Sequence, residues 1–393
     1  DDDLDAMNAN QKELKFNEDS KNNVRVLVRK RPIFQHEIEG SEFDVVSCME
    51  GRTAVIHDTR MHADMRRMLI TNNAFGFDGV FDEHSSNERV YQSACKPLVR
   101  EAVLGGYATV CVYGQTGSGK SFTMTSFYEK AAHDIFAELD ALNDRMYDLP
   151  RISMSFFELQ GESCLDLLNT FQPAQLLTAQ DGGVHAVPVV EPIISSAEEM
   201  VGLIHHALSI RSTSATGVHD ASSRSHAILR VYVEQPATEE SPGEAMLRKE
   251  QFMPIVPAIR GEGVLTLVDL AGSEQSIDSM YHTAELRKEG AAINSSLMAL
   301  KDCIRAKANG STATHIYRKS KLTMALKDSF VLPTARTVIV ATVSPSSKDT
   351  EHSLNTLRHA CLMDGQSQKD NEETRFMTGG TKSQTYQVGE VDV

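Results

Sequence analysis

The chain has 393 residues, of which 41% are hydrophobic and 24% charged, which is typical of globular proteins and allows one large domain or two average ones. Its net charge of −15 argues against nucleic acid as the main partner. No secretory signal opens the sequence and no stretch approaches the roughly 18 apolar residues of a membrane span, so we expect an intracellular protein without a membrane partner.

In chain order, residues 1–22 are acidic and polar and predict an N-terminal tail or the stub of a longer region. A β-branched run at 24–28 predicts the first strand. Further strand-like runs follow at 108–112, 152–159, 227–233, 264–268 and 337–343.

Helical patterns lie between these strands. Val201, Ile204 and Leu208 share one face, and a second apolar face is formed by Ile293, Leu297, Leu300 and Ile304. Strands that alternate with helices predict a layered α/β fold.

Three features of the chain suggest no chemistry of their own. Residues 234–263 are rich in Pro, Glu and Gly and predict a long hairpin connection or surface insertion. Residues 365–393 are polar and aperiodic and predict a flexible C-terminal tail. The six cysteines form no C-x-x-C pair, so neither zinc nor a disulfide scaffold is indicated.

Residues 114–121, which read Gly-Gln-Thr-Gly-Ser-Gly-Lys-Ser, fit the pattern G-x-x-x-x-G-K-[ST] and follow a predicted buried strand. The glycines allow consecutive backbone N–H groups to point at phosphate oxygens. Lys120 would reach the β and γ phosphates, and the Ser121 hydroxyl suits a magnesium ion. The segment therefore predicts a nucleotide-binding loop at the start of a helix.

Two further segments have the residue types that this chemistry needs. Residues 222–226 read Ser-Ser-Arg-Ser-His before a strand, and residues 269–274 read Asp-Leu-Ala-Gly-Ser-Glu after another. An Asp at the end of a buried strand can hold a magnesium-bound water. A Gly three residues later can offer its N–H to a γ phosphate and move when that phosphate leaves.

Together the three segments resemble the phosphate loop, switch I and switch II of kinesin motor domains. Other stretches that resemble the family occur in family order over roughly residues 23 to 364, at 29–32, 289–294, 320–323 and 354–360. The resemblance implies a kinesin-like P-loop NTPase motor domain at 23–364, with a central mixed β-sheet flanked by helices. No sustained heptad pattern occurs, so a dimerising coiled coil is not expected in this segment.

The resemblance also implies a role for each matching residue, with ATP or ADP and Mg²⁺ as ligands. Ser222, Arg224, Gly272 and Glu274 would be catalytic, with Arg224 and Glu274 forming an ion pair that closes the site. Ser121 and Ser223 would lie on the magnesium side, and Asp269 would act through water. The nucleotide itself would be bound by Arg29, Arg31, Pro32, Gln115, Thr116, Gly117, Ser118, Gly119, Lys120, Ser121 and Phe122.

A basic segment at 287–330 contains nine basic and three acidic residues. A charge run is most often a solvated helix face, but a patch of one sign can steer association even in an acidic protein. The resemblance makes this patch the expected surface for microtubules and tubulin dimers, through Lys301, Arg305, Arg318, Lys321 and Lys327.

Within the family, several stretches resemble the microtubule-depolymerising kinesin-13 group. Val28–Pro32 matches its V-R-K-R-P opening, and 300–305 is close to its L-K-E-C-I-R segment. The group's K-V-D loop tip aligns with 62–64, where only Asp64 survives and His62 replaces Lys. An ordinary surface hairpin at 51–74 is the alternative.

Two other functions stay open at this point. His219 and Ser295 stand where the family usually has Asn and Lys, which allows a regulatory tubulin-binding module with weak ATPase. A plus-end-directed walker is the other. We expect a location in the cytoplasm on the microtubule cytoskeleton, with the mitotic spindle as one possible site.

Overall fold

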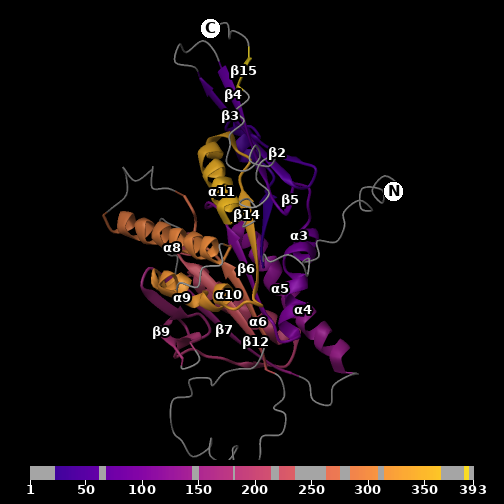
Figure 1. Ribbon diagram of the computed structural model, residues 1–393, viewed down its shortest axis with the longest axis vertical. Coiled ribbons are helices and arrows are strands. Elements are labelled where there is room, and N and C mark those ends of the chain that lie inside the picture. Colours follow the sequence, from indigo (N-terminus) through magenta and orange to yellow (C-terminus); the bar gives the residue numbers. More distant parts are fainter. Residues whose placement is uncertain are drawn as a thin grey trace, which may run out of the picture.

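The computed structural model describes residues 23–61, 68–143, 150–179, 182–213, 221–234, 263–274, 284–308, 314–363 and 385–388. Its centre is an 11-stranded sheet with the strand order β10-β9-β8-β7-β12-β13-β6-β14-β1-β5, and β11 pairs with β7 (Figure 1). The strands of this sheet are β1 (Val24–Lys30), β5 (Gly79–Phe81), β6 (Tyr107–Tyr113), β7 (Arg151–Gln160), β8 (Ser163–Asp166), β9 (Gln172–Thr178), β10 (Val184–Val187), β11 (Ile193–Ile194), β12 (His226–Glu234), β13 (Gly263–Asp269) and β14 (Arg336–Val343).

The sheet is mixed. Strands β13, β6, β14, β1 and β5 run parallel to their neighbours on one side, whereas β12, β7, β8, β9 and β10 pair antiparallel on the other. Each strand predicted from the sequence is present within two residues of its expected bounds, because β-branched runs suit a buried pleated surface.

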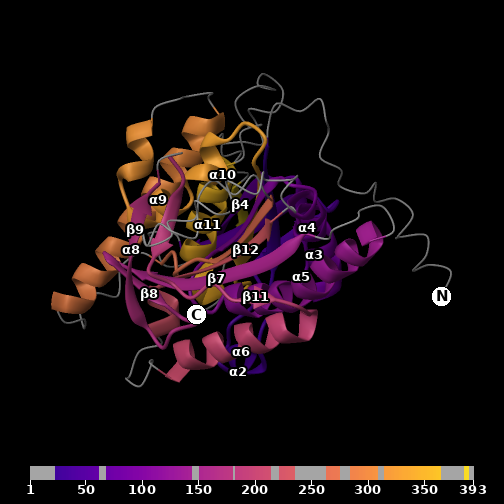
Figure 2. The same ribbon diagram turned by 90° about the horizontal axis from the view of Figure 1, so that it is seen from below.

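Helices cover both faces of the sheet (Figure 2). One face carries α3 (Asn87–Ala94), α4 (Lys96–Val103), α5 (Lys120–Asn143) and α6 (Ala197–Thr213). The other carries α8 (Ala284–Ala308), α9 (Lys321–Ala325), α10 (Lys327–Val331) and α11 (Thr350–Met363). Short helical segments also occur at α2 (Gln35–Glu39), η1 (Ala221–Arg224), η3 (Thr314–Arg318) and η4 (Ser347–Asp349).

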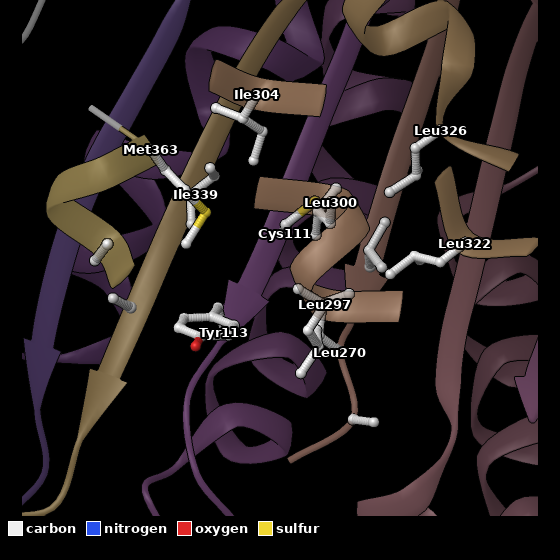
Figure 3. Close-up of a cluster of buried hydrophobic side chains, with 14 of the residues drawn as sticks. Cys111, Tyr113, Leu270, Leu297, Leu300, Ile304, Leu322, Leu326, Ile339 and Met363 are labelled. Carbon is white, nitrogen blue, oxygen red and sulfur yellow. The ribbon is translucent and has the colours of Figure 1, made fainter. Parts of the chain in front are cut away.

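The apolar stripe of α8 packs on the sheet as its period predicted. Leu300 lies beside Cys111 of β6, Ile304 points toward Ile339 of β14, and Leu297 belongs to the same cluster (Figure 3). All five are buried. Truncating such a leucine to alanine typically costs about 2–5 kcal/mol, so this stripe fixes the position of α8 over the sheet.

A second sheet has the order β15-β4-β3-β2, with β2 (Val46–Met49), β3 (Thr53–Met61), β4 (Met68–Gly76) and β15 (Thr385–Val388). Strands β3 and β4 form one long antiparallel hairpin that extends beyond the main sheet at the top of Figure 1. The tip, 62–67, lies outside the described residues. The Arg60 side chain, near the described end of β3, forms an ion pair with Glu351 of α11.

Three other segments that the sequence singled out lie wholly or partly outside the described residues. Residues 1–22 and 235–262 do so entirely, although β12 and β13 pair antiparallel, as a hairpin connection requires. The C-terminal segment was expected to be a flexible tail, yet Thr385–Val388 forms β15 along the free edge of β4. An unpaired strand edge offers N–H and C=O groups to any extended segment, which the tail's polar composition did not reveal.

Candidate functional site

The phosphate loop joins the carboxyl end of β6 to the first turn of α5. Gly117 and Gly119 have φ angles of 77° and 99°, which residues with a Cβ rarely adopt. Lys120 is buried, and its Nζ donates to the carbonyl oxygen of Gln115 at 2.9 Å. The loop is thus a cradle with a buried ammonium group and a helix N-terminus at its base, an arrangement suited to phosphate.

The residues expected on the magnesium side of the site lie where β13 ends beside β6. The Oδ2 atom of Asp269 accepts hydrogen bonds from the Ser121 hydroxyl at 3.0 Å and from Arg211 at 3.3 Å. Its Oδ1 atom is buried and has no hydrogen-bond partner among the described residues. An unsatisfied carboxylate oxygen beside a serine hydroxyl fits the water shell of Mg²⁺, and half-buried Ser223 lies on the neighbouring η1.

Arg211 was missed by the sequence reasoning. Its buried guanidinium contacts the carboxylates of Glu158 and Asp269 and the backbone carbonyl of Ser225. It therefore ties α6 to β7, β13 and the switch I segment. A signal was present: Arg211 continues the apolar face of Ile204 and Leu208 on α6, so the helical period placed a lone cation in the core.

Switch II is held against both other segments. The Gly272 N–H donates to Ser223 O at 2.8 Å, and the Ser273 N–H donates to Gly114 O at 3.1 Å. The Glu274 carboxylate accepts from Thr116, at 2.9 Å from its backbone N and 2.6 Å from its hydroxyl. In this conformation the phosphate loop and both switches form one hydrogen-bonded unit.

The expected ion pair between Arg224 and Glu274 is not formed in this conformation. Glu274 binds Thr116 instead, because the switch II backbone positions its carboxylate over the phosphate loop. Arg224 lines a cavity of about 190 Å³ between η1, α8 and α9. The two charged residues therefore lie close to the site but with different neighbours.

The residues expected to bind the nucleoside lie at the end of β1 and at the start of α5. Arg29 donates to the Thr123 hydroxyl at 2.9 Å and lies over the Phe122 ring at 5.3 Å. Arg31 binds Gly117 O at 2.8 Å and forms a two-pronged ion pair with Glu37, whose pKa it lowers. Phe122 is 66% exposed and Pro32 is also exposed, so an apolar surface is open beside the loop.

A buried histidine, also missed, links the site to α8. Nδ1 of His226 accepts the Ala271 N–H at 3.0 Å, so Nε2 carries the proton and donates to the Ser296 hydroxyl at 2.9 Å. Burial, with the charges of Arg211 and Lys120, lowers the pKa of His226 to about 3 and keeps it neutral. The Ser296 hydroxyl in turn donates to Ile293 O at 2.7 Å.

The basic patch is smaller than the sequence predicted. Lys301 is only 7% exposed and lies over the Tyr113 ring at 5.6 Å, so it cannot be part of a surface patch in this conformation. Burial lowers its pKa to about 8. The physical reason is its position one helical turn from Leu297 and Ile304, on the buried stripe.

The other predicted patch residues lie nearer the surface. Arg318 is exposed, whereas Arg305, Lys321 and Lys327 are half-buried, and Lys327 donates to Gly182 O. Lys319, which is exposed and paired with Asp302, adds to this surface.

Three predicted site residues cannot be placed. His62, Asp64 and the side chain of Ser222 lie outside the described parts of the structure, as does His219. No helix among the described residues has the length and apolar character needed to cross a membrane.

Comparisons with known proteins agree with one another. The profile of the kinesin motor domain matches residues 29–364. Diatom spindle kinesin-1 of Cylindrotheca fusiformis is 39% identical over 340 residues, which cover 86% of this chain and 50% of that protein. Human kinesin-like protein KIF24 is 36% identical over 346 residues, covering 86% of this chain and 23% of that protein. Rice kinesin-like protein KIN-13A is 34% identical over 376 residues, covering 95% and 45%.

The chain spans half or less of the length of these relatives. Two solved structures share its fold. The C-terminal motor and motor homology domain of Kar3Vik1 has a TM-score of 0.71 at 26% identity and covers 88% of this chain and 86% of that one. A fast kinesin has a TM-score of 0.69 at 28% identity, covering 86% and 90%.

Proposed function

The chain belongs to the kinesin motor-domain family, and on this basis we propose that it is a microtubule-stimulated ATP hydrolase. The observation that carries the proposal is the close packing of the phosphate loop against Asp269 of β13 and against switch II. Residues 23–364 would form the motor domain.

Binding of ATP would use groups that this structure already positions. Lys120 and the N–H groups of 117–121 would neutralise phosphate charge, as preorganised donors do in a site that excludes water. The adenine ring would lie against Pro32 and Phe122, with Arg29 behind the Phe122 ring. Gln115, Thr116 and Ser118 shape the same loop.

Ser121 and Ser223 would hold Mg²⁺, with Asp269 acting through a water molecule on its unsatisfied Oδ1. The metal supplies charge neutralisation between the phosphates. Arg211 donates to the other carboxylate oxygen and so helps to hold Asp269 in its orientation.

Hydrolysis needs a water molecule in line with the terminal phosphate. Ser222, Arg224 and Glu274 would hold this water once the site closes, and the Gly272 N–H would exchange Ser223 O for the γ phosphate. The release of that phosphate would let switch II move, and the His226–Ser296 hydrogen bond would pass the movement to α8.

Microtubules and tubulin dimers are the proposed partners. Arg318 is the most accessible of the predicted basic residues, with Arg305, Lys321 and Lys327 beside it and Lys319 added.

We also propose that the protein shortens microtubules from their ends. The V-R-K-R-P opening, the 34% identity to KIN-13A and the long β3–β4 hairpin support this proposal. A cytoplasmic location on microtubules, including the spindle, follows from it.

The physical basis of shortening would be a shift in population. A protein drives tubulin from straight to curved only by binding the curved form more tightly. A hairpin tip that reaches between tubulin dimers, with His62 and Asp64, could supply that difference. A plus-end-directed walker is the competing function, and a tubulin-binding module with weak ATPase is the second.

Lys120→Ala tests the enzymatic part. We expect ATP turnover with microtubules to fall at least about 100-fold, because the variant loses the buried ammonium group that would neutralise charge on the transferring phosphoryl group. Lys130→Ala on the outer face of α5 is the matched control and should keep its activity. Retention of a third of wild-type turnover by Lys120→Ala would contradict the site.

Video microscopy of stabilised microtubules tests the motor output. With ATP we expect filaments to shorten from their ends, whereas a non-hydrolysable analogue should allow binding without repeated release. Directed gliding would favour the walker. Tubulin binding without stimulated phosphate release would favour the regulatory module.

A further inference from the structure

Thr116 holds the switch II carboxylate on the phosphate loop. Its backbone N–H and its hydroxyl both donate to Glu274, at 2.9 Å and 2.6 Å. The carboxylate also lies within 2.4 Å of the point where a Cβ on Gly272 would stand, so this arrangement requires glycine there. A negatively charged side chain thus occupies two donors of a loop whose other donors would bind phosphate in the proposed function.

We propose that Thr116 is a positioning residue that keeps Glu274 away from Arg224, and that Glu274 exchanges Thr116 for Arg224 when the site closes. The proposal rests on the proposed ATPase function. It assigns to the Thr116 hydroxyl a role in the open conformation, in addition to any contact between the loop and the nucleotide.

Electrostatic repulsion between the nucleotide phosphates and Glu274 would displace the carboxylate from Thr116. A phosphate group entering the loop brings negative charge close to the Glu274 carboxylate, and like charges at this range repel. Arg224 is the cation that can accept the displaced carboxylate. It lines a cavity of about 190 Å³ between η1, α8 and α9. Nucleotide arrival and site closure are thereby coupled through one carboxylate with two alternative partners.

The test uses equilibrium binding of a fluorescent, non-hydrolysable ATP analogue to the full chain, compared with binding of the ADP analogue. Thr116→Val removes the hydroxyl and keeps the size, so the open conformation loses a charge-assisted hydrogen bond. We expect the preference for the triphosphate over the diphosphate to rise about fivefold. Thr116→Ser keeps the hydroxyl and should behave as wild type.

Two double variants separate this role from direct contact between Thr116 and nucleotide. In the Glu274→Ala background there is no carboxylate to hold, and in the Arg224→Ala background there is no alternative partner. We expect the effect of Thr116→Val to disappear in both. The same change in all backgrounds, or an equal effect of Thr116→Ser, would overturn the proposal.

This measurement needs no hydrolysis and no microtubules. Absence of any nucleotide binding in the wild type would instead contradict the proposed ATPase. The two failures are therefore distinguishable. Circular dichroism of each variant confirms that it is folded before binding is compared.

Discussion

Gly272 is the residue at which both switches and the phosphate loop meet. A Cβ at this position would lie 2.3 Å from Glu274 Oε2 and 2.5 Å from the Thr116 hydroxyl. Both obstacles are ends of side chains that can move, so alanine can be accommodated only if Glu274 leaves Thr116. A side chain at position 272 would therefore disturb the contact between Glu274 and Thr116 more than the packing of the fold.

Gly272→Ala should therefore leave folding nearly intact and damage turnover. We expect the free energy of unfolding to change by about 1 kcal/mol or less, and ATP turnover to fall at least about tenfold. Urea unfolding and a phosphate-release assay measure the two quantities. Gly290→Ala on α8, where a Cβ meets nothing within 4 Å, is the control. Normal turnover in Gly272→Ala would count against a switch role.

The burial of Lys301 shows that a count of basic residues does not tell which of their side chains are exposed. The sequence identified a basic segment but not which cations face outward, although the period of Leu297 and Ile304 already placed Lys301 on the buried stripe. Lys120 and Asp269, in contrast, could be singled out from the sequence because each belongs to a motif of a few adjacent residues, and their proposed roles rest on those motifs. The Thr116–Glu274 contact joins positions 158 residues apart and could not be read from spacing.

The buried Lys301 predicts a pH dependence of stability. Burial lowers its pKa from 10.5 to about 8 in the folded chain, so the protonated form is disfavoured there. Between about pH 8 and 10.5 the unfolded chain keeps a proton that the folded chain has lost. The free energy of unfolding should therefore rise across this window, and the penalty should be fully present below it.

Lys301→Met should remove this penalty. We expect the variant to be about 1–2 kcal/mol more stable than wild type at pH 7, with the advantage shrinking as the pH approaches 10.5. Urea unfolding at pH 7 and pH 9.5 provides the comparison. Lys288 is on the same helix but exposed, so Lys288→Met should leave the free energy of unfolding unchanged at both pH values. Parallel pH profiles for wild type and Lys301→Met would contradict a buried charge.

At the scale of elements, α8 is the helix that would connect the proposed nucleotide site with the basic patch, because Ser296 of α8 contacts His226 beside switch II. Its apolar stripe, and hence its contact with the sheet, followed directly from hydrophobic period. Its polar link to the switches did not, because the hydrogen bond between His226 and Ser296 joins residues 70 positions apart. Period predicts which face is buried, whereas a single polar contact depends on the tertiary structure.

Ser296→Ala should weaken communication along this link. It leaves the buried His226 Nε2–H without its acceptor, which costs about 1–3 kcal/mol. We expect microtubule stimulation of ATP turnover to fall about fivefold while basal turnover changes less. Ser295→Ala, an exposed neighbour on α8, is the matched control. An equal loss of basal and stimulated turnover would indicate a general loss of stability instead.

At the scale of the whole molecule, the two proposed functions, attachment to microtubules and shortening of their ends, belong to two different surfaces. The patch around Arg318 lies beside α8 and α9, and the β3–β4 hairpin projects from the far end of the fold (Figure 1). The α/β architecture could be predicted because strands and helices alternate along the chain. The pairing of β15 with β4 could not, because it depends on an edge that exists only after the hairpin forms.

The separation of these surfaces allows each to be impaired alone. Arg318→Glu should weaken attachment to the microtubule lattice, more so at low salt where screening is least, while leaving basal ATP turnover nearly intact. Co-sedimentation measures this attachment.

Changing both His62 and Asp64 to alanine should spare attachment and abolish end shortening, because the tip would no longer favour curved tubulin. Time-lapse microscopy of stabilised microtubules measures the shortening. His62→Lys places a permanently charged side chain at this position, as in the K-V-D motif, and should raise shortening. Undiminished shortening by the double alanine variant would remove the hairpin from the mechanism, and unchanged binding by Arg318→Glu would move the track-binding surface elsewhere.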